Sequence, residues 1–216
     1  MSITTIAPAI LSTNPTEYKQ IVQEYFPFAK RVHIDVSDGT LTKNLTIPES
    51  GIWWPRGWTV DIHMMSAKPS AHLDMLIRLH PNLVLFHAEA SEDLMPIIDA
   101  VKQAGMKAGI VIVKNVYPGS IKTILNAVDH ALIFSGDLGK QGGEADFMQL
   151  EKVSLIQQIH PGIEIGWDGG ANIDNVRFIT HGGVDVINVG SGLAKAPNKQ
   201  EMYEQLLKET ENEAPI

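Results

Sequence analysis

The chain has 216 residues, of which 44% are hydrophobic and 19% are charged, a balance typical of one globular domain. Its formal net charge is -8 and it carries no basic stripe, so nucleic acids and anionic membrane surfaces are poor candidates as partners. The sequence contains no cysteine, which excludes disulfide bonds, thiolate metal sites and cysteine nucleophiles.

The N-terminal residues lack the basic and apolar segments of a signal peptide. No apolar run approaches the length of a transmembrane helix. No linker, low-complexity tract or internal repeat divides the chain. We therefore expect a cytoplasmic protein that forms a single domain over residues 1–216.

Short runs rich in Ile and Val alternate along the chain with longer amphipathic stretches. The runs predict strands at 6–11, 31–37, 59–65, 83–89, 108–113, 131–136, 163–168 and 186–190. Most gaps between them carry a helical pattern, at 15–25, 70–79, 92–104, 119–128, 147–160, 173–181 and 199–210. Eight strands alternating with helices predict an α/β fold, a single (β/α)8 TIM barrel, with an open doubly wound sheet as the alternative.

Side chains that can cap a helix mark three of the predicted helix starts. Asn14 precedes the helix at 15–25, Ser91 precedes the one at 92–104, and Asn172 precedes the one at 173–181.

The connection over 47–58 departs from the alternation because two prolines and two glycines argue against a regular helix. It also holds Trp53, Trp54 and Trp58. We expect these indoles to cover the bottom of the barrel or a subunit interface, with direct substrate contact as the alternative.

The predicted strand at 31–37 alternates three aliphatic residues with His33, Asp35 and Ser37. Successive side chains of a strand point to opposite faces, so His33 and Asp35 point the same way. Burying an imidazole and a carboxylate together is costly unless both find partners. A metal ion would satisfy both groups, although a pair with this spacing is also common in sites without a metal.

Two further strands supply candidate ligands for the same ion. His63 lies late in the strand at 59–65, and Asp168 ends the strand at 163–168. Barrel sites form at the C-terminal ends of the strands, so His33, Asp35, His63 and Asp168 could converge there. Two imidazoles and two carboxylates suit Zn²⁺, Fe²⁺ or Mn²⁺.

Other polar residues receive lesser roles. His87 and Glu89 lie late in the predicted strand at 83–89 and are expected to support the ligands or to face substrate. Asp61 lies deeper on the same face as His63, where a structural polar contact is expected. The remaining histidines fall in or beside helical stretches and are expected at the surface or in packing: His72, His80, His130, His160 and His181.

Glycine-rich loops follow the last three predicted strands, at 135–143, 169–172 and 190–192. Glycine lets the backbone approach a ligand closely, and free backbone N–H groups bind anions. The loops after strands 7 and 8 are the usual phosphate site of barrels, so these loops predict a phosphate-binding site.

Taken together, these residues resemble the ribulose-phosphate 3-epimerases along almost the whole chain. The resemblance lies in Ala-Pro-Ala-Ile-Leu-Ser at 7–12, His-Ile-Asp-Val-Ser-Asp-Gly at 33–39, Asn-Leu-Thr at 44–46, Asp-Ile-His-Met-Met at 61–65, Phe-His-Ala-Glu-Ala at 86–90, Lys-Ala-Gly at 107–109, Asp-Gly-Gly at 168–170 and Gly-Ser at 190–191. Each stretch alone is weak evidence, whereas the set is specific.

The resemblance implies a barrel of the ribulose-phosphate-binding type that holds one divalent metal ion, with Zn²⁺ as first choice and Fe²⁺, Mn²⁺ or Co²⁺ as alternatives. It implies that His33, Asp35, His63 and Asp168 are the ligands and that Asp35 and Asp168 are also the catalytic acid/base pair. A homo-oligomer is expected. Residues expected to bind the sugar phosphate are Ser12, Met65, His87, Gly139, Gly142, Gly143, Gly169, Gly170, Gly190 and Ser191.

The implied chemistry explains these residue types. Inversion at C3 of a 2-ketose phosphate removes a proton next to a carbonyl group, and a metal ion stabilises the enediolate that develops. The proton must leave one face and return to the other, which two carboxylates on opposite sides of the sugar can achieve. The reaction requires no redox cofactor and no covalent nucleophile.

The sequence departs from the family pattern around the expected substrate. Ala9 stands where the family has Ser, Ser37 stands where it has Met, and the loops after strands 5, 6 and 8 differ. D-ribulose 5-phosphate and D-xylulose 5-phosphate are the expected substrates, and another ketose phosphate, such as a hexulose 6-phosphate, is the alternative. A decarboxylase or aldolase relative is disfavoured because no Asp-x-Lys-x-x-Asp motif is present, and a non-catalytic sugar-phosphate-binding barrel is the remaining alternative.

Overall fold

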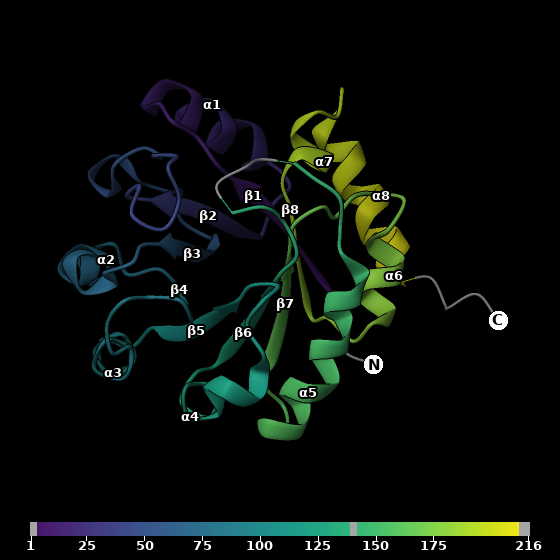
Figure 1. Cartoon of the computed structure of the whole chain (residues 1–216). Coiled ribbons are helices and arrows are strands. Elements are labelled where there is room, and N and C mark those ends of the chain that lie inside the picture. Colours follow the sequence, from purple (N-terminus) through teal and green to yellow (C-terminus); the bar gives the residue numbers. More distant parts are fainter. Residues whose placement is uncertain (1–3, 139–141, 212–216) are drawn as a thin grey trace.

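A computed structural model describes residues 4–138 and 142–211 as one closed barrel of eight parallel strands in chain order (Figure 1). The strands are β1 (Thr5–Ile10), β2 (Arg31–Ser37), β3 (Thr59–Met65), β4 (Leu83–His87), β5 (Lys107–Ile112), β6 (His130–Phe134), β7 (Glu164–Asp168) and β8 (Val186–Val189). The predicted TIM barrel is confirmed. Each predicted strand agrees with the observed one to within about two residues at either end, the usual uncertainty of element boundaries.

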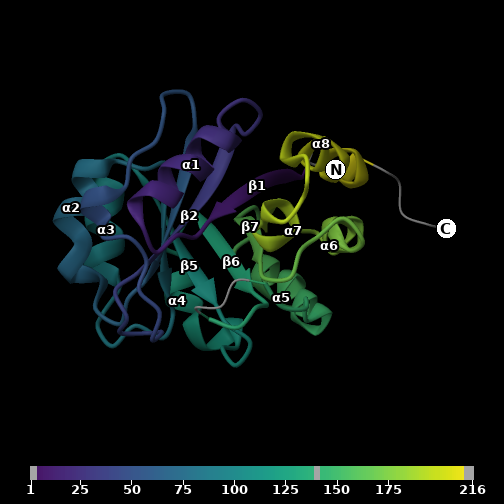
Figure 2. The same cartoon turned by 90° about the horizontal axis from the view of Figure 1, so that it is seen from above.

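The helices surround the barrel on its outside, as the two perpendicular views show (Figure 2). The α-helices are α1 (Pro15–Tyr25), α2 (Leu73–Leu79), α3 (Met95–Gln103), α4 (Lys122–Leu125), α5 (Glu151–Ile159), α6 (Val176–His181), α7 (Ser191–Ala194) and α8 (Lys199–Glu211). The 3₁₀ helices are η1 (Glu49–Gly51), η2 (Pro69–His72), η3 (Pro118–Ile121) and η4 (Phe147–Leu150). The short α7 has no counterpart among the predicted elements.

One of the three predicted helix caps is confirmed. The Asn14 side chain accepts a hydrogen bond from the Glu17 backbone N–H at 2.8 Å, which satisfies one free donor of α1. Ser91 does not cap α3, because its hydroxyl donates to Ala67 O at 2.8 Å and the helix begins only at Met95. Asn172 is likewise three residues too early, because α6 begins at Val176.

The strands carry apolar side chains on both faces in one half of the barrel. The large core lies between the strands and the helices. A separate cluster contains strand residues of β4 to β6 without any helix residue, so it occupies the face toward the barrel axis. Its buried members are Leu83, Leu85, Val111, Val113, Leu132 and Phe134. The other half of the interior, on β2, β3, β7 and β8, carries polar side chains, and buried histidines also lie at the end of β4 (His87) and at the start of β6 (His130).

Charged residues close the N-terminal end of the barrel. Arg31 at the start of β2 donates to Asp61 at 2.7 Å and to both carboxylate oxygens of Glu164 at 2.9 and 2.8 Å. His130 Nδ1 lies 2.7 Å from the same Glu164 carboxylate. Asp61 thus has the structural role predicted for it. His130 was misplaced: it is the first residue of β6 and is buried, because the predicted strand began one residue too late.

The tryptophan-rich connection packs beside α1 outside the barrel. Tyr18 donates its hydroxyl to Trp53 O at 2.7 Å and meets the Trp53 ring edge-to-face. Trp58 is buried next to Phe26 just before β3 begins. These indoles therefore cover α1 and the approach to the N-terminal end of β3.

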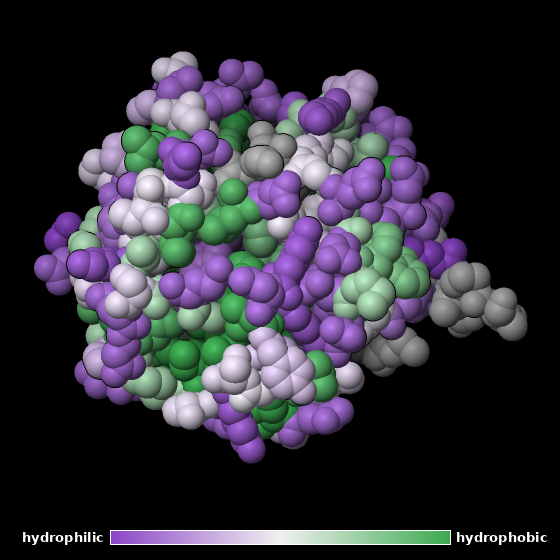
Figure 3. Space-filling model, viewed as in Figure 1, coloured by the Kyte–Doolittle hydropathy of each residue, from purple (hydrophilic) through white to green (hydrophobic). Residues whose placement is uncertain are grey.

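In the view of Figure 3, hydrophilic and hydrophobic areas are interspersed, and one pale hydrophobic area lies over α6. Phe178 on α6 is 57% exposed and packs against Phe147, with ring centroids 4.9 Å apart. Within the described residues, no helix is long and apolar enough to cross a membrane.

Candidate metal centre

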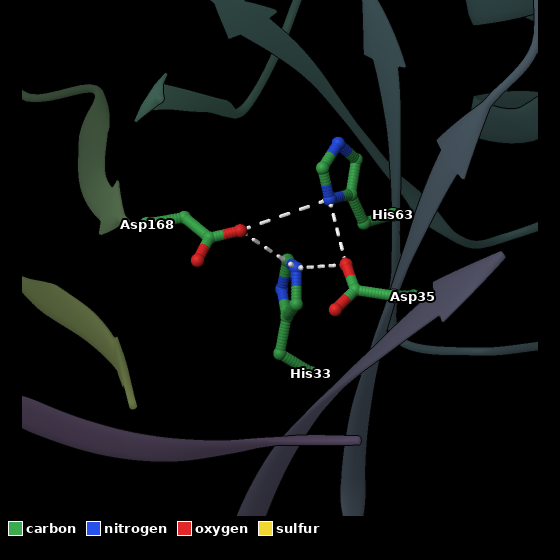
Figure 4. A group of neighbouring side chains, drawn as sticks. All are labelled: His33, Asp35, His63 and Asp168. Carbon is green, nitrogen blue, oxygen red and sulfur yellow. Dashed lines mark hydrogen bonds and ion pairs between the residues drawn. The ribbon is translucent and has the colours of Figure 1, made fainter. Parts of the chain in front are cut away.

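The four predicted ligands come from β2, β3 and β7 and meet inside the barrel. Parallel pairing of β2 with β3 places Asp35 directly beside His63, and His33 lies two residues earlier on the same face of β2. Asp168 is the last residue of β7 and reaches the same point from another side of the barrel (Figure 4).

The side chains of the four predicted ligands converge. His63 Nδ1 lies 2.9 Å from Asp35 Oδ1 and 3.8 Å from Asp168 Oδ2. His33 Nε2 lies 3.3 and 3.5 Å from the same two oxygens. One ligand atom from each residue lies within 4.8 Å of all the others, and Figure 4 shows this arrangement.

These residues fit a divalent metal ion. Ligand atoms about 2.0–2.2 Å from one tetrahedral ion lie about 3.3–3.6 Å apart, and the four separations above bracket that range. His33 Nε2 is also a buried atom that makes no well-aligned hydrogen bond within the described part of the chain. An imidazole nitrogen without a hydrogen-bond partner, next to two carboxylates, can offer its lone pair to a cation.

The electrostatics of the group also call for a cation. Burial lowers the pKa of His33, but the carboxylates of Asp168 and Asp35 outweigh burial and raise it to about 10. Burial raises the pKa of Asp35, but the imidazoles of His33 and His63 outweigh burial and lower it far below its usual range. A proton on His33 therefore supplies the positive charge that a metal ion would otherwise bring.

His87 and Glu89 lie behind His63. His63 Nε2 lies 2.8 Å from His87 Nε2, and His87 Nδ1 lies 3.3 Å from Glu89 Oε2. Burial lowers the pKa of His87 to about 4, so its ring is neutral. A neutral His87 can accept a hydrogen bond from His63 Nε2–H and donate one to Glu89, which leaves the lone pair of His63 Nδ1 directed at the carboxylates.

Sequence reasoning missed Asn188, which lies behind His33. Its amide nitrogen is 3.0 Å from His33 Nδ1, and both residues are buried. A polar residue inside the otherwise aliphatic β8 was the available signal, since β8 reads Val-Ile-Asn-Val. Pairing of β7 with β8 places Asn188 beside Asp168.

A cavity opens beside the four ligands at the C-terminal end of the barrel. Its wall includes Asp35, His63 and Asp168, together with predicted phosphate-site residues from three loops. The cavity also contacts Leu11, Phe134 and Ala171, which carry no chemical signal in the sequence. The sequence-predicted substrate residues that line it are Met65, Gly142, Gly169, Gly170, Gly190 and Ser191.

Three further predicted substrate residues, Ser12, His87 and Gly143, do not line this cavity. Ser12 is buried and donates to Asn14 O and to the Glu17 carboxylate at the start of α1. His87 is buried behind His63, and Gly143 follows Gly142 with open space around its Cα. Gly139 lies outside the described residues. Substrate contacts by these four residues stay predictions.

Two glycines let the loop after β7 fit against the loop after β6. Gly169 and Gly170 have φ values of 108° and 73°, in the region that favours glycine. A Cβ on Gly169 would collide with the backbone of Gly136, and a Cβ on Gly170 would collide with the backbone of Ala145. The floor of this part of the cavity therefore depends on the absence of two side chains.

Comparisons with known proteins identify the family of this chain. The model of the ribulose-phosphate 3 epimerase family matches residues 5–194. A ribulose-phosphate 3-epimerase of Helicobacter pylori is 27% identical over 208 residues, which cover 93% of this chain and 95% of that protein. The cytoplasmic isoform of rice ribulose-phosphate 3-epimerase is 27% identical over 95% of this chain and 94% of its own length.

The fold also resembles that of solved structures with other activities. The 3-keto-L-gulonate-6-phosphate decarboxylase of Vibrio cholerae superposes with a TM-score of 0.74 over 97% of this chain and 98% of its own. Its sequence identity of 14% makes this a likeness of fold alone.

Proposed function

Because the chain belongs to the ribulose-phosphate 3-epimerase family, whose members are isomerases, we propose that it interconverts D-ribulose 5-phosphate and D-xylulose 5-phosphate. The observation that carries the proposal is the convergence of two imidazoles and two carboxylates at the wall of one cavity. We further propose that this epimerisation depends on a divalent metal ion.

His33, Asp35, His63 and Asp168 would hold the ion, with Zn²⁺ as first choice and Fe²⁺, Mn²⁺ or Co²⁺ as alternatives. When bound, a divalent cation supplies the positive charge that stabilises an enediolate. Both imidazoles are fully buried, whereas the carboxylates of Asp35 and Asp168 remain 12% and 14% exposed. The carboxylates are thus the two solvent-exposed members of the group, and both border the cavity.

Asp35 and Asp168 are proposed as the acid/base pair. They project from β2 and β7, on two sides of the centre in Figure 4. One carboxylate removes the C3 proton and the other delivers a proton to the opposite face, which inverts the carbon. The lowered pKa of Asp35 keeps this carboxylate ionised, the form that a general base requires.

The glycine-lined part of the cavity is proposed to bind the phosphate group. Three neighbouring loops contribute backbone to one wall of the cavity, at Gly142, Gly169, Gly170, Gly190 and Ser191. Backbone N–H groups that a side chain does not shield are suited to anionic oxygens. Holding the phosphate there would fix the position of C3 relative to Asp35 and Asp168.

The test is turnover of D-ribulose 5-phosphate by the metal-loaded protein and by its Asp168→Asn variant. Asn keeps the shape of Asp but cannot carry the proton, so we expect kcat to fall by at least about 10²-fold. Circular dichroism should show an unchanged barrel. A matched control is Asp174→Asn in the loop after β7, which should keep full activity. Absence of turnover by the unaltered protein would contradict the proposal.

A hexulose 6-phosphate is the second candidate substrate. A further cavity of about 290 Å³ adjoins the first, and the two share Leu11 and Met65 in their walls. Ser37 lines the second cavity, and Ala9 lines the first. These two small residues leave room for a longer sugar. Comparison of kcat/KM for the pentulose and hexulose phosphates decides between the candidates.

Homo-oligomerisation stays a prediction from the sequence. Multi-angle light scattering of the purified protein measures its molar mass directly. A mass of one chain, about 23.7 kDa, would contradict the prediction.

A further inference from the structure

Among the residues that the structure describes, two buried atoms near the centre have no hydrogen-bond partner, and they belong to side chains in contact. One is His33 Nε2, which faces the carboxylates of Asp35 and Asp168. The other is the amide oxygen of Asn188, whose amide nitrogen lies 3.0 Å from the opposite ring nitrogen of His33. Such atoms are rare in folded proteins, because burial of a polar atom without a partner is costly.

In this orientation the Asn188 amide and a metal-binding His33 exclude each other. An amide N–H that donates to His33 Nδ1 requires a lone pair on that nitrogen, so the ring proton resides on Nε2. A protonated Nε2 cannot bind a metal ion. The nitrogen that faces Asp35 and Asp168 would then be a donor, which is unsuitable for the proposed centre.

A half-turn of the amide removes the conflict. The amide nitrogen and oxygen occupy nearly the same shape, so rotation by 180° exchanges them without displacing other atoms. The amide oxygen then accepts a hydrogen bond from His33 Nδ1–H, and the ring keeps its lone pair on Nε2. One rotation therefore gives the amide oxygen a partner and turns His33 Nε2 into a metal ligand.

We propose that Asn188 is a positioning residue that holds His33 in the tautomer able to bind the metal ion. This inference rests on the proposed metal centre. It assigns to β8 a role that complements the His87–Glu89 pair behind His63, so that each imidazole has its own acceptor on the side away from the ion. Asn188 also lines the substrate cavity, so it links the centre to the cavity wall.

The first experiment measures affinity for Co²⁺ and Zn²⁺ by competition with a chromophoric chelator. Asn188→Leu removes the acceptor at similar volume and should weaken binding by about 10- to 100-fold. Asn188→Asp keeps an acceptor at the same place and should bind within a few-fold of the unaltered protein. Binding by the Leu variant within about two-fold of the unaltered protein would overturn the proposal.

Urea unfolding of the metal-free variants separates positioning from general destabilisation. A buried carboxylate is more costly than a buried Leu, so Asn188→Asp should be the less stable variant and yet the better metal binder. A purely structural role for Asn188 predicts that metal affinity follows stability instead. Asn82→Leu is the matched control: Asn82 also makes one amide hydrogen bond to the barrel, to Val60 N–H, far from the ligands.

Two further measurements distinguish a failure of the role proposed for Asn188 from a failure of the proposed metal centre. His33→Ala should abolish tight binding; if it does not, His33 is no ligand and both proposals fail. If His33→Ala weakens binding and Asn188→Leu does not, only the role of Asn188 fails. Long-range ¹H–¹⁵N spectra of the zinc-loaded unaltered protein should show the His33 proton on Nδ1, and a proton on Nε2 would overturn the inference without any variant.

Discussion

Gly170 shows at the scale of one residue how the cavity depends on backbone shape. Its φ of 73° favours glycine, and a Cβ there would meet the backbone of Ala145 in the loop after β6. Any side chain at this position must therefore move one of two loops that both line the cavity. Gly57 has a φ of 96°, but a Cβ there would meet no other atom. A substitution at Gly57 therefore introduces backbone strain alone, whereas one at Gly170 introduces strain and a collision.

We predict that Gly170→Ala raises the KM for the sugar phosphate, because the displaced loops no longer fit the phosphate group. Both Gly170→Ala and Gly57→Ala should lose about 1–3 kcal/mol of stability from strain at positive φ. Steady-state kinetics and urea unfolding measure the two effects. Equal KM values for the two variants would show that loop contact at Gly170 is unimportant for binding.

Single residues also show where sequence reasoning succeeds. His33 and Asp35 were recognisable because alternation in one strand fixes the face on which side chains lie, and fold-level rules placed His63 and Asp168 at the same end. Asn188 was not recognisable as a partner of His33. His33 on β2 meets Asn188 on β8 because of the register in which β1 pairs with both strands. A single sequence does not reveal this register.

At the scale of an element, β4 supplies support to a ligand carried by β3. Its last residue, His87, lies against His63 and meets Glu89 just beyond the strand. The planes of the His63 and His87 rings are inclined by only 16°, and the ring centroids lie 5.0 Å apart. β4 therefore fixes both the orientation and the tautomer of His63.

We predict that His87→Leu weakens metal binding by about 10- to 100-fold, because His63 loses the acceptor that orients it. Glu89→Gln should have a smaller effect, since an amide oxygen can still accept from His87. Chelator competition measures both. His160→Leu serves as control, because His160 bonds to Leu125 O after α5, remote from the centre, and should leave affinity unchanged.

Strands were more predictable than helices in this chain. Buried strands are short apolar runs, so composition marks both of their ends. The helices after β4 and β7 begin later than predicted, at Met95 and Val176, because loop residues before them use their polar groups elsewhere. Ser91 bonds to the loop after β3, a tertiary contact that capping rules based on local sequence do not include.

The whole barrel is joined at its N-terminal end by the ion cluster of Arg31, Asp61, His130 and Glu164. The cluster links β2 and β3 to β6 and β7 across the interior. Burial raises the pKa of Glu164, but Arg31 and His130 outweigh burial and lower it far below its usual range. Glu164 therefore stabilises the folded barrel while its carboxylate is ionised.

We predict that Glu164→Gln lowers the free energy of unfolding at pH 7 by about 2 kcal/mol, a value reduced because the side chain is partly exposed. The folded-state pKa lies below the unfolded one, so this stabilisation is complete above the unfolded pKa and declines as pH falls through the folded one. The difference between the two proteins should shrink as pH falls below about 4.

Urea unfolding at several pH values measures this difference. Glu204→Gln on the exposed face of α8 is the control and should change stability by less than about 0.5 kcal/mol at every pH. A difference for Glu164→Gln that stays constant from pH 7 to pH 4 and below would show that the ion pair is not its source.

The distribution of the four ligands along the chain has a consequence for biosynthesis. His33, Asp35 and His63 emerge early from the ribosome, whereas Asp168 on β7 emerges only after most of the barrel has been made. A nascent chain therefore offers an incomplete set of metal-binding side chains until β7 has been made and pairs with β6. Binding of the proposed metal ion should accordingly be a late event in synthesis of the chain, and a truncated or proteolysed chain that lacks β7 should not retain the ion.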